Sequence, residues 1–213
     1  ALVLSVACVS EPAPTPPVQT PATATATTPA QPATPVQAST QTQAEPDIAK
    51  LIASGDAAGL RALFKGREQA NQVGADGLYP LHSAVQKKSG EMVEILLAMG
   101  AVPDPLDKDG KTPLRYAVEQ SDEASAKALV AKGASVFLAD KAGVSPLDAA
   151  IAKRFTAALV DRNVVARSGK DGRTPLHIAV DRLSMEAVRI ILDLNPDLSS
   201  KDGAARTPLD AAF

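Results

Sequence analysis

The chain has 213 residues and a formal net charge of -2, with 22 Lys and Arg against 24 Asp and Glu. This balance excludes a strongly basic nucleic-acid-binding protein, although it leaves room for a local basic face. Cys8 is the sole cysteine, so an internal disulfide and a cysteine-rich zinc site are also excluded.

Residues 1–10, ALVLSVACVS, form an apolar run that is too short to span a membrane as a helix. The run resembles the end of a secretory signal. The stretch from Leu4 to Cys8 resembles a bacterial lipobox, since small Ala7 precedes the cysteine, although Ser5 stands where the lipobox usually has Leu. We expect Cys8 to be lipidated and the protein to be exported to the cell envelope, in the periplasm or at the outer surface. The alternative is a plain cleaved signal with an incidental cysteine.

Residues 11–46 contain nine Pro among 36 positions, and Thr and Ala supply most of the rest. The segment has no hydrophobic period and cannot form a core. Repeated Pro favours extended polyproline II stretches, which at about 3.1 Å per residue would reach roughly 110 Å. We therefore expect a disordered linker that holds the following domain away from a membrane.

The rest of the chain repeats a unit centred on Pro-Leu. Successive prolines of this core lie 33, 33, 29 and 33 residues apart. A period near 33 residues predicts a solenoid of stacked units. A glycine precedes each core, and in the last copy it is Gly203, with two extra residues between. The five cores are Tyr79-Pro80-Leu81, Thr112-Pro113-Leu114, Ser145-Pro146-Leu147, Thr174-Pro175-Leu176 and Thr207-Pro208-Leu209.

Each part of the unit suits a helix–turn–helix. Asp-Gly pairs such as Asp109-Gly110 favour a tight turn, because Gly accepts positive φ. Thr or Ser then caps a helix with its hydroxyl, and Pro fits the first helical position. Small residues let neighbouring units approach closely, and a residue in the left-handed conformation ends the second helix. The residues expected in these last two roles are Ala84, Ala117, Ala149 and Ala179, and then Gly100, Gly133 and Asn195.

The segment Thr174-Pro175-Leu176-His177-Ile178-Ala179 resembles the ankyrin signature Thr-Pro-Leu-His-x-Ala, and the next-best match runs from Pro80 to Ala84. The resemblance covers residues 47–213. It implies an all-α ankyrin repeat solenoid of stacked helix–turn–helix pairs, whose turn tips project to one side as a curved binding surface. Residues 47–74 would then form an N-terminal cap with two short amphipathic helices over 47–66. Full repeats would start at about residue 75, with a partial repeat at the C-terminus.

The third repeat departs from the period. It is four residues short between Ser145 and about Lys170. We therefore expect its second helix, around Ala157 to Asp161, to be clipped and the stack to be irregular there. The motif histidine is also replaced in three repeats, by Arg115, Asp148 and Asp210.

The two histidines of the chain, His82 and His177, both occupy the motif position. The resemblance implies that each imidazole hydrogen-bonds the turn and the helix start, which is a structural role. Three repeats apart, they would not reach one substrate. No Gly-x-Ser-x-Gly nucleophile elbow occurs. The sequence predicts no catalytic residue, cofactor, metal site or small-molecule substrate.

The resemblance implies a non-catalytic scaffold that binds a protein partner through turn tips and first helices. Basic residues outnumber acidic ones among these positions and are expected to be exposed, which favours a partner with an acidic surface; the alternative is that they only aid solubility. A further alternative is nucleic-acid or other polyanion binding through the basic turn tips, which the neutral charge and the export signal disfavour. The candidate residues are Leu78, Lys108, Lys111, Lys141, Val144, Lys170 and Arg173 in the turns, and Gln86, Lys87, Glu119, Gln120, Lys153, Asp181 and Arg182 on the first helices.

Overall fold

The computed structural model describes residues 48–63 and 69–212. Within these residues all regular elements are helices, which confirms the all-α class, and none of those helices is long and apolar enough to cross a membrane. The segments 1–10 and 11–46, and Cys8 with them, lie outside the described residues. The elements are α1 Ile48–Ser54, α2 Ala57–Ala62, η1 Gln69–Asn71, α3 Pro80–Gln86, α4 Gly90–Ala98, α5 Pro113–Gln120, α6 Glu123–Ala131, α7 Pro146–Ala152, α8 Thr156–Leu159, α9 Arg162–Val165, α10 Pro175–Asp181, α11 Met185–Leu192 and η2 Asp210–Ala212.

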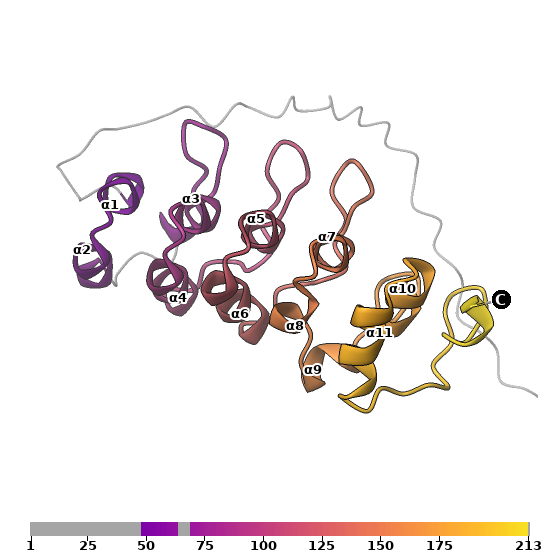
Figure 1. Cartoon of the computed structure of the whole chain (residues 1–213). Coiled ribbons are helices and arrows are strands. Elements are labelled where there is room, and N and C mark those ends of the chain that lie inside the picture. Colours follow the sequence, from indigo (N-terminus) through magenta and orange to yellow (C-terminus); the bar gives the residue numbers. More distant parts are fainter. Residues whose placement is uncertain (1–47, 64–68, 213) are drawn as a thin grey trace, which may run out of the picture. The chain divides into compact units, whose positions relative to one another are not determined.

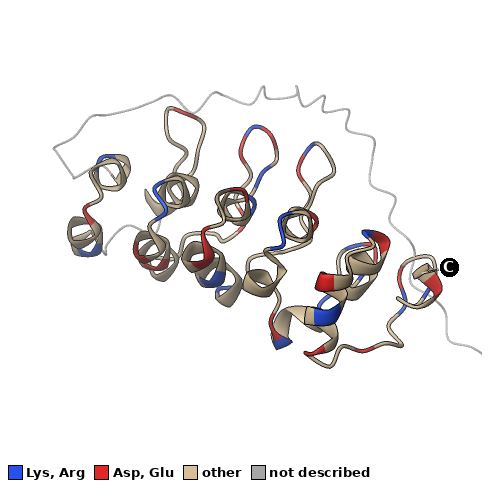
Figure 2. Ribbon diagram, viewed as in Figure 1, with Lys and Arg blue, Asp and Glu red and all other residues tan. Residues whose placement is uncertain are grey.

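The helices stack as pairs that lie side by side (Figure 1). The first helices α1, α3, α5 and α7 form one layer, and the second helices α2, α4, α6 and α8 form another. The pair α10 and α11 continues the stack, and η2 packs on α10. Each helix packs mainly on its partner and on the equivalent helix of the next pair, so nearest-neighbour contacts hold the stack together. Acidic and basic residues are interspersed along it (Figure 2).

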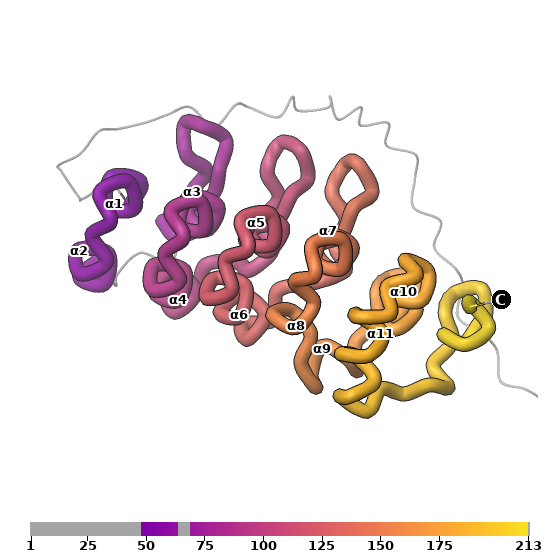
Figure 3. The backbone as a smooth tube through the Cα atoms, in the orientation of Figure 1, coloured from indigo at the N-terminus to yellow at the C-terminus, as the bar shows by residue number. Residues whose placement is uncertain are grey.

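Hairpin turns project beyond the layer of first helices, as the backbone tube shows at α3, α5 and α7 (Figure 3). In the second turn, the backbone N–H of Asp107 donates to the carbonyl of Lys111 at 3.1 Å. Asp107 Oδ1 in return accepts from the backbone N–H groups of Asp109 and Lys111, both at 2.8 Å. The fourth residue of each turn has positive φ, which glycine adopts without steric cost. These five residues are Gly77, Gly110, Gly143, Gly172 and Ala205.

The last turn differs from the sequence expectation. It runs from Asp202 to Arg206, and its fourth residue is Ala205 with φ 61°, not Gly203. Gly203 is the second residue, and its backbone N–H donates to the carbonyl of Asp171 in the preceding turn at 2.7 Å. The two apparent extra residues arise because Gly203 does not occupy the glycine position of the repeat.

The first helices begin as the Thr-Pro-Leu pattern predicts. Thr112 Oγ1 accepts from the backbone N–H of Arg115 at 3.2 Å, and Ser145 Oγ accepts from that of Asp148 at 3.1 Å. Proline occupies the start of both helices, where its missing N–H has no intrahelical partner. The expected left-handed residues at the ends of second helices are confirmed at Gly100, Gly133 and Asn195, with φ of 91°, 92° and 56°.

Small residues lie between adjacent first helices and let them approach closely. Ala84, Ala117, Ala150 and Ala179 occupy one repeat position, and each has an exposed fraction of 0%. The prediction of Ala149 at this position is wrong by one residue, since Ala150 occupies it. Ala149 instead lines a groove on the surface of α7. The misassignment arose because two adjacent alanines follow the Pro-Leu core in this repeat.

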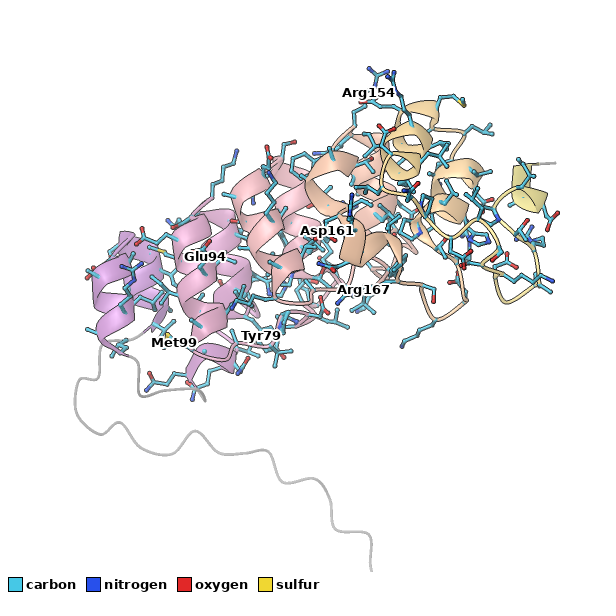
Figure 4. All side chains as sticks on the ribbon, turned by 90° about the horizontal axis from the view of Figure 1, so that it is seen from below. Tyr79, Glu94, Met99, Arg154, Asp161 and Arg167 are labelled. Carbon is cyan, nitrogen blue, oxygen red and sulfur yellow. The ribbon has the colours of Figure 1, made fainter. Side chains whose placement is uncertain are left out.

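The shortened third repeat is irregular, as expected. Its second helix is divided into α8 and α9, with 4 residues each, whereas α4 and α6 have 9 residues each. Asp161, expected near the end of a helix, begins one instead. Its Oδ1 accepts from the backbone N–H groups of Asn163 and Val164 at 2.8 Å. Asp161 and Arg167 flank α9 in Figure 4.

Candidate partner-binding face

His82 and His177 each bridge two neighbouring repeats. His177 Nδ1 lies 3.2 Å from the backbone nitrogen of Thr174, which can only donate, so Nδ1 accepts and Nε2 carries the proton. Nε2 then donates to the carbonyl of Arg206 in the next turn at 3.0 Å. His82 Nε2 makes the same bond to the carbonyl of Lys111 at 3.0 Å, and burial lowers the pKa of His82. The expected structural role of both histidines is confirmed.

A polar cluster supports the second turn. The Tyr116 hydroxyl donates to Asp107 Oδ2 at 2.8 Å, and the Tyr116 ring meets His82 edge-on with centroids 5.4 Å apart. Burial and the bond to Asp107 raise the pKa of Tyr116 to about 12. Burial opposes ionisation of Asp107, but hydrogen bonds from Tyr116 and from two backbone amides outweigh it and lower the pKa of Asp107. These groups serve the turn and are poor candidates for acid–base chemistry.

Two turn cations that were expected to be exposed are engaged in ion pairs. Lys111 Nζ lies 2.9 Å from Glu119 Oε1, and Arg173 pairs with Asp181. The side chains of Lys111 and Arg173 are each only 29% exposed. Both pairs join a turn to the first helix that follows it. They offset part of the positive charge that the sequence suggested for this face.

Lys108, Lys141 and Lys170 occupy the second position of three consecutive turns. All three are exposed, and none pairs with a carboxylate of the described residues. The backbone N–H of Lys141 donates to the carbonyl of Asp109 at 3.0 Å, which joins the second and third turns. The described turns show no such bond between 74–78 and 107–111 or between 140–144 and 169–173, but Gly203 makes it between the last two turns. These backbone bonds therefore join the second turn to the third and the fourth turn to the fifth.

A groove of about 490 Å³ crosses α7 on the side of the first helices. It forms because α7 presents Ala149 and Ala152 where the equivalent positions of α5 carry Tyr116 and Glu119. Small side chains in one helix of a row leave a hollow between the larger ones on either side. The apolar lining residues are Val144, Ala149, Ile151 and Ala152, and the polar ones are Arg115, Glu119, Asp148, Lys153, Arg182 and Ser184.

Asp148 stands at the motif-histidine position beside this groove. Its Oδ2 accepts from the Ser145 hydroxyl at 2.6 Å, and its Oδ1 accepts from Arg182 Nε at 2.8 Å. Burial opposes ionisation of Asp148, but the bonds from Ser145 and Arg182 outweigh it and lower the pKa of this carboxyl. The bond from a histidine to the next turn is thus replaced here by an ion pair between α7 and α10.

The remaining charges of the groove leave one cation without a carboxylate. Arg115 lies between two carboxylates, with Nη1 3.3 Å from Glu119 Oε1, which also pairs with Lys111, and Nε 3.7 Å from Asp140 Oδ2. Lys153 Nζ instead donates to the backbone carbonyl of Glu119 near the C-terminal end of α5, and it pairs with no carboxylate of the described residues. The lining holds three cationic side chains and two carboxylates. The groove therefore carries a net charge of one positive unit, contributed by Lys153.

Two further cavities lie towards the ends of the stack. One, of about 510 Å³, lies between α1 and the first turn and includes Ile48 and Leu78. The other, of about 540 Å³, lies between α9 and the loop after α11 and includes Arg162 and Asn195. Neither gathers a set of groups suited to catalysis. Over residues 48–63 and 69–212, no group of three or more His, Cys, Asp or Glu side chains could hold a metal ion.

Comparison with known proteins agrees with this repeat geometry. A sequence model of ankyrin repeats in three copies matches residues 42–140, and a model of the single ankyrin repeat matches residues 171–203. The chain belongs to the ankyrin repeat family. The stretch between the two matches, 141–170, is largely the irregular third ankyrin repeat.

A solved ankyrin structure supports the fold. The ankyrin repeat domain of Bcl-3, described as a unique member of the IkappaB protein family, is 21% identical and superposes with a TM-score of 0.56. The match covers 80% of this chain and 81% of that chain. At this identity the similarity shows the ankyrin fold alone. None of the curated proteins matches the chain.

The ankyrin stack brings some of the predicted partner-binding residues together and keeps others apart. Glu119, Val144, Lys153 and Arg182 meet at the groove. Leu78 lines the cavity beside α1 instead. The others do not line the groove; they are Gln86 and Lys87 at the end of α3, Lys108, Lys111, Lys141, Lys170 and Arg173 in the turns, Gln120 on α5 and Asp181 on α10.

Six groove residues were absent from the predicted set, namely Arg115, Asp148, Ala149, Ile151, Ala152 and Ser184. Arg115 and Asp148 replace the motif histidine, at a position for which the ankyrin resemblance implies a structural role. The two alanines carried a signal that comparison across ankyrin repeats could have revealed. Two small residues three positions apart on one first helix, flanked by larger residues at the equivalent positions of its neighbours, indicate a hollow.

Proposed function

We propose that this chain is a non-catalytic scaffold that binds a protein partner across its turns and first helices, centred on the groove over α7. Ankyrin repeats generally mediate protein–protein interaction. The observation that carries the proposal is the groove itself, which combines an apolar lining with charged side chains on the face formed by α5, α7 and α10. Pockets of this kind accept the anchoring side chains that dominate binding energy at protein interfaces.

We further propose that the chain is exported and tethered to a membrane through Cys8, with residues 11–46 as a spacer. The support is the lipobox-like sequence around Cys8 and the proline content of the spacer. Fatty-acid labelling in a bacterial host should mark the wild type but not Cys8→Ser, and that variant should move to the soluble fraction. An unlabelled wild type in the soluble fraction would indicate plain secretion.

A second candidate is binding of nucleic acid or another polyanion. It is favoured by the three exposed lysines at consecutive turns, Lys108, Lys141 and Lys170. Pairing of Lys111 and Arg173 with carboxylates weighs against it. Heparin or DNA binding that falls steeply with salt, and that is lost when the three exposed lysines are changed to Glu, would favour this candidate.

The groove is tested by filling it. Phage-displayed random peptides are selected on the full chain, and the affinities of enriched peptides are measured by fluorescence polarisation. Ala152 is exposed on α7, so Ala152→Trp should block the groove without disturbing the core. We expect it to weaken peptide binding at least about tenfold, as loss of an anchoring pocket does. Circular dichroism checks that the variant folds.

Ala98→Trp is the matched control. Ala98 is also an exposed alanine, but it lies on the second helix α4. We expect it to leave the affinity unchanged. Equal loss in both variants, or no loss in Ala152→Trp, would show that partners do not bind at the groove.

A further inference from the structure

We infer that the groove over α7 selects a protein segment that carries one carboxylate beside a medium-sized aliphatic side chain such as Leu, Ile or Met. The inference rests on the proposed function, because it names the chemistry of the partner at the same groove. The small side chains of α7 favour the aliphatic residue, and the uncompensated charge of Lys153 favours the carboxylate.

The aliphatic part follows from the shape of the lining. At the two repeat positions held by Ala149 and Ala152, α10 carries Ile178 and Asp181. The hollow on α7 therefore lacks the volume of two larger side chains. Its floor is formed by methyl-bearing side chains, including Val144 and Ile151. Burying an aliphatic side chain against such a floor removes apolar surface from water on both partners.

The carboxylate part follows from how Lys153 is held. Its ammonium donates to the carbonyl of Glu119 near the end of α5, where the unsatisfied carbonyls of a helix C-terminus favour a cation. This contact positions the charge beside the groove but does not neutralise it. Arg182 is already paired with Asp148, and Arg115 with both Glu119 and Asp140. One partner carboxylate would complete the charge balance of the lining.

Other partner chemistries fit the groove less well. A basic side chain would meet Lys153 and the exposed Arg182, and like charges brought together lower affinity. A polyanion would need several unpaired cations, whereas this groove offers one. A second carboxylate would have to displace Asp148 or Glu119 from an existing ion pair. The groove is thus suited to a single acidic residue.

The test uses the peptides selected on the full chain. We expect enriched sequences to contain Asp or Glu within one or two positions of an aliphatic residue. For each peptide, the acid is then replaced by its amide, and the affinity is compared between the wild type and Lys153→Gln. On the wild type, the amide should bind up to about fivefold more weakly, as expected for one partly exposed ion pair. On Lys153→Gln, the exchange should have little effect.

Lys87→Gln is the control for this charge, because Lys87 occupies the repeat position of Lys153 on α3. The peptides should bind Lys87→Gln as tightly as the wild type. Acid-to-amide exchange that costs the same affinity on Lys153→Gln as on the wild type would overturn the inference. So would groove-binding peptides that lack an acid. Either result leaves the proposed function standing if Ala152→Trp still weakens binding, whereas peptides insensitive to Ala152→Trp would contradict both.

Discussion

Ala205 alone among the fourth residues of the five turns adopts positive φ without being glycine. An L-residue with a Cβ pays about 1–2 kcal/mol in the left-handed region, and the greater freedom of an unfolded glycine offsets part of the relief. We therefore expect Ala205→Gly to raise the free energy of unfolding by up to about 1 kcal/mol. Urea unfolding followed by circular dichroism measures the change.

Ala204 provides the control in the same turn, since it does not have positive φ. Ala204→Gly adds backbone freedom without relieving strain, so it should lower stability by about 0.5–1 kcal/mol. Substitutions that shift stability in the same direction would show that the backbone of Ala205 is not strained.

His82 should make stability depend on pH. Burial lowers the pKa of His82 in the folded protein below the unfolded value of about 6.5. Between these two values the unfolded chain binds more protons, so stability is complete above the unfolded pKa and falls as the pH drops towards the folded one. Protonation of Nδ1 would also destroy the acceptor for the backbone N–H of Tyr79. Urea midpoints of the wild type should fall on acidification from pH 7, relative to those of His82→Gln. Parallel curves for the two proteins would contradict this assignment.

At the scale of helices and turns, the sequence was most informative where one residue defines one position. Pro and Leu of each core located α3, α5, α7 and α10 correctly, because proline at a helix start has one favourable position. The assignment of repeat positions was wrong where two neighbouring residues fitted the same position, as the adjacent alanines Ala149 and Ala150 did. It also failed where the repeat was shortened, because the sequence did not show that Asp161 would cap a new helix.

The candidate site was less predictable than the fold. A period of 33 residues states which positions are equivalent, but it does not state which side chains of neighbouring repeats meet. The pairs Lys111–Glu119 and Arg182–Asp148 depend on how turns and helices are spaced in three dimensions. The sequence therefore indicated the face, but not which of its charges are free.

The third repeat should be the least protected part of the stack. Its second helix is split, and the pair α7–α8 is joined to the pair α10–α11 by partly exposed ion pairs, Arg182–Asp148 and Arg154–Glu186. The Arg154 side chain is 83% exposed and labelled in Figure 4. Such pairs contribute about 0–1 kcal/mol and weaken in salt. Amide hydrogens of residues 145–170 should exchange faster than those of 77–133, and the difference should grow in high salt. Uniform exchange would show that the shortening is absorbed without loss.

At the scale of the whole molecule, the balance between paired and free charges predicts how charge-reversal substitutions change the stability of the fold. In the wild type, Lys111 pairs with Glu119 and Arg173 pairs with Asp181. Changing both Lys111 and Arg173 to Glu would replace each of these ion pairs by two facing carboxylates. We expect this double variant to lose about 1–2 kcal/mol of stability in total. Lys108→Glu with Lys170→Glu changes the same number of charges at free positions and should stay within about 0.5 kcal/mol of the wild type. Thermal or urea unfolding distinguishes the pairs, and equal losses would contradict the pairing.

The divided second helix of the third repeat also bears on how the stack responds to mechanical load. Tension applied along a solenoid passes through each interface in series, because every repeat contacts only its neighbours. The interface between α7–α8 and α10–α11 should therefore separate before the others under tension. The stack would then divide into two blocks of repeats. The groove is lined by α5 and α7 on one side of this interface and by Arg182 and Ser184 on the other. A partner bound in the groove would contact both blocks and would stabilise the interface between them against extension.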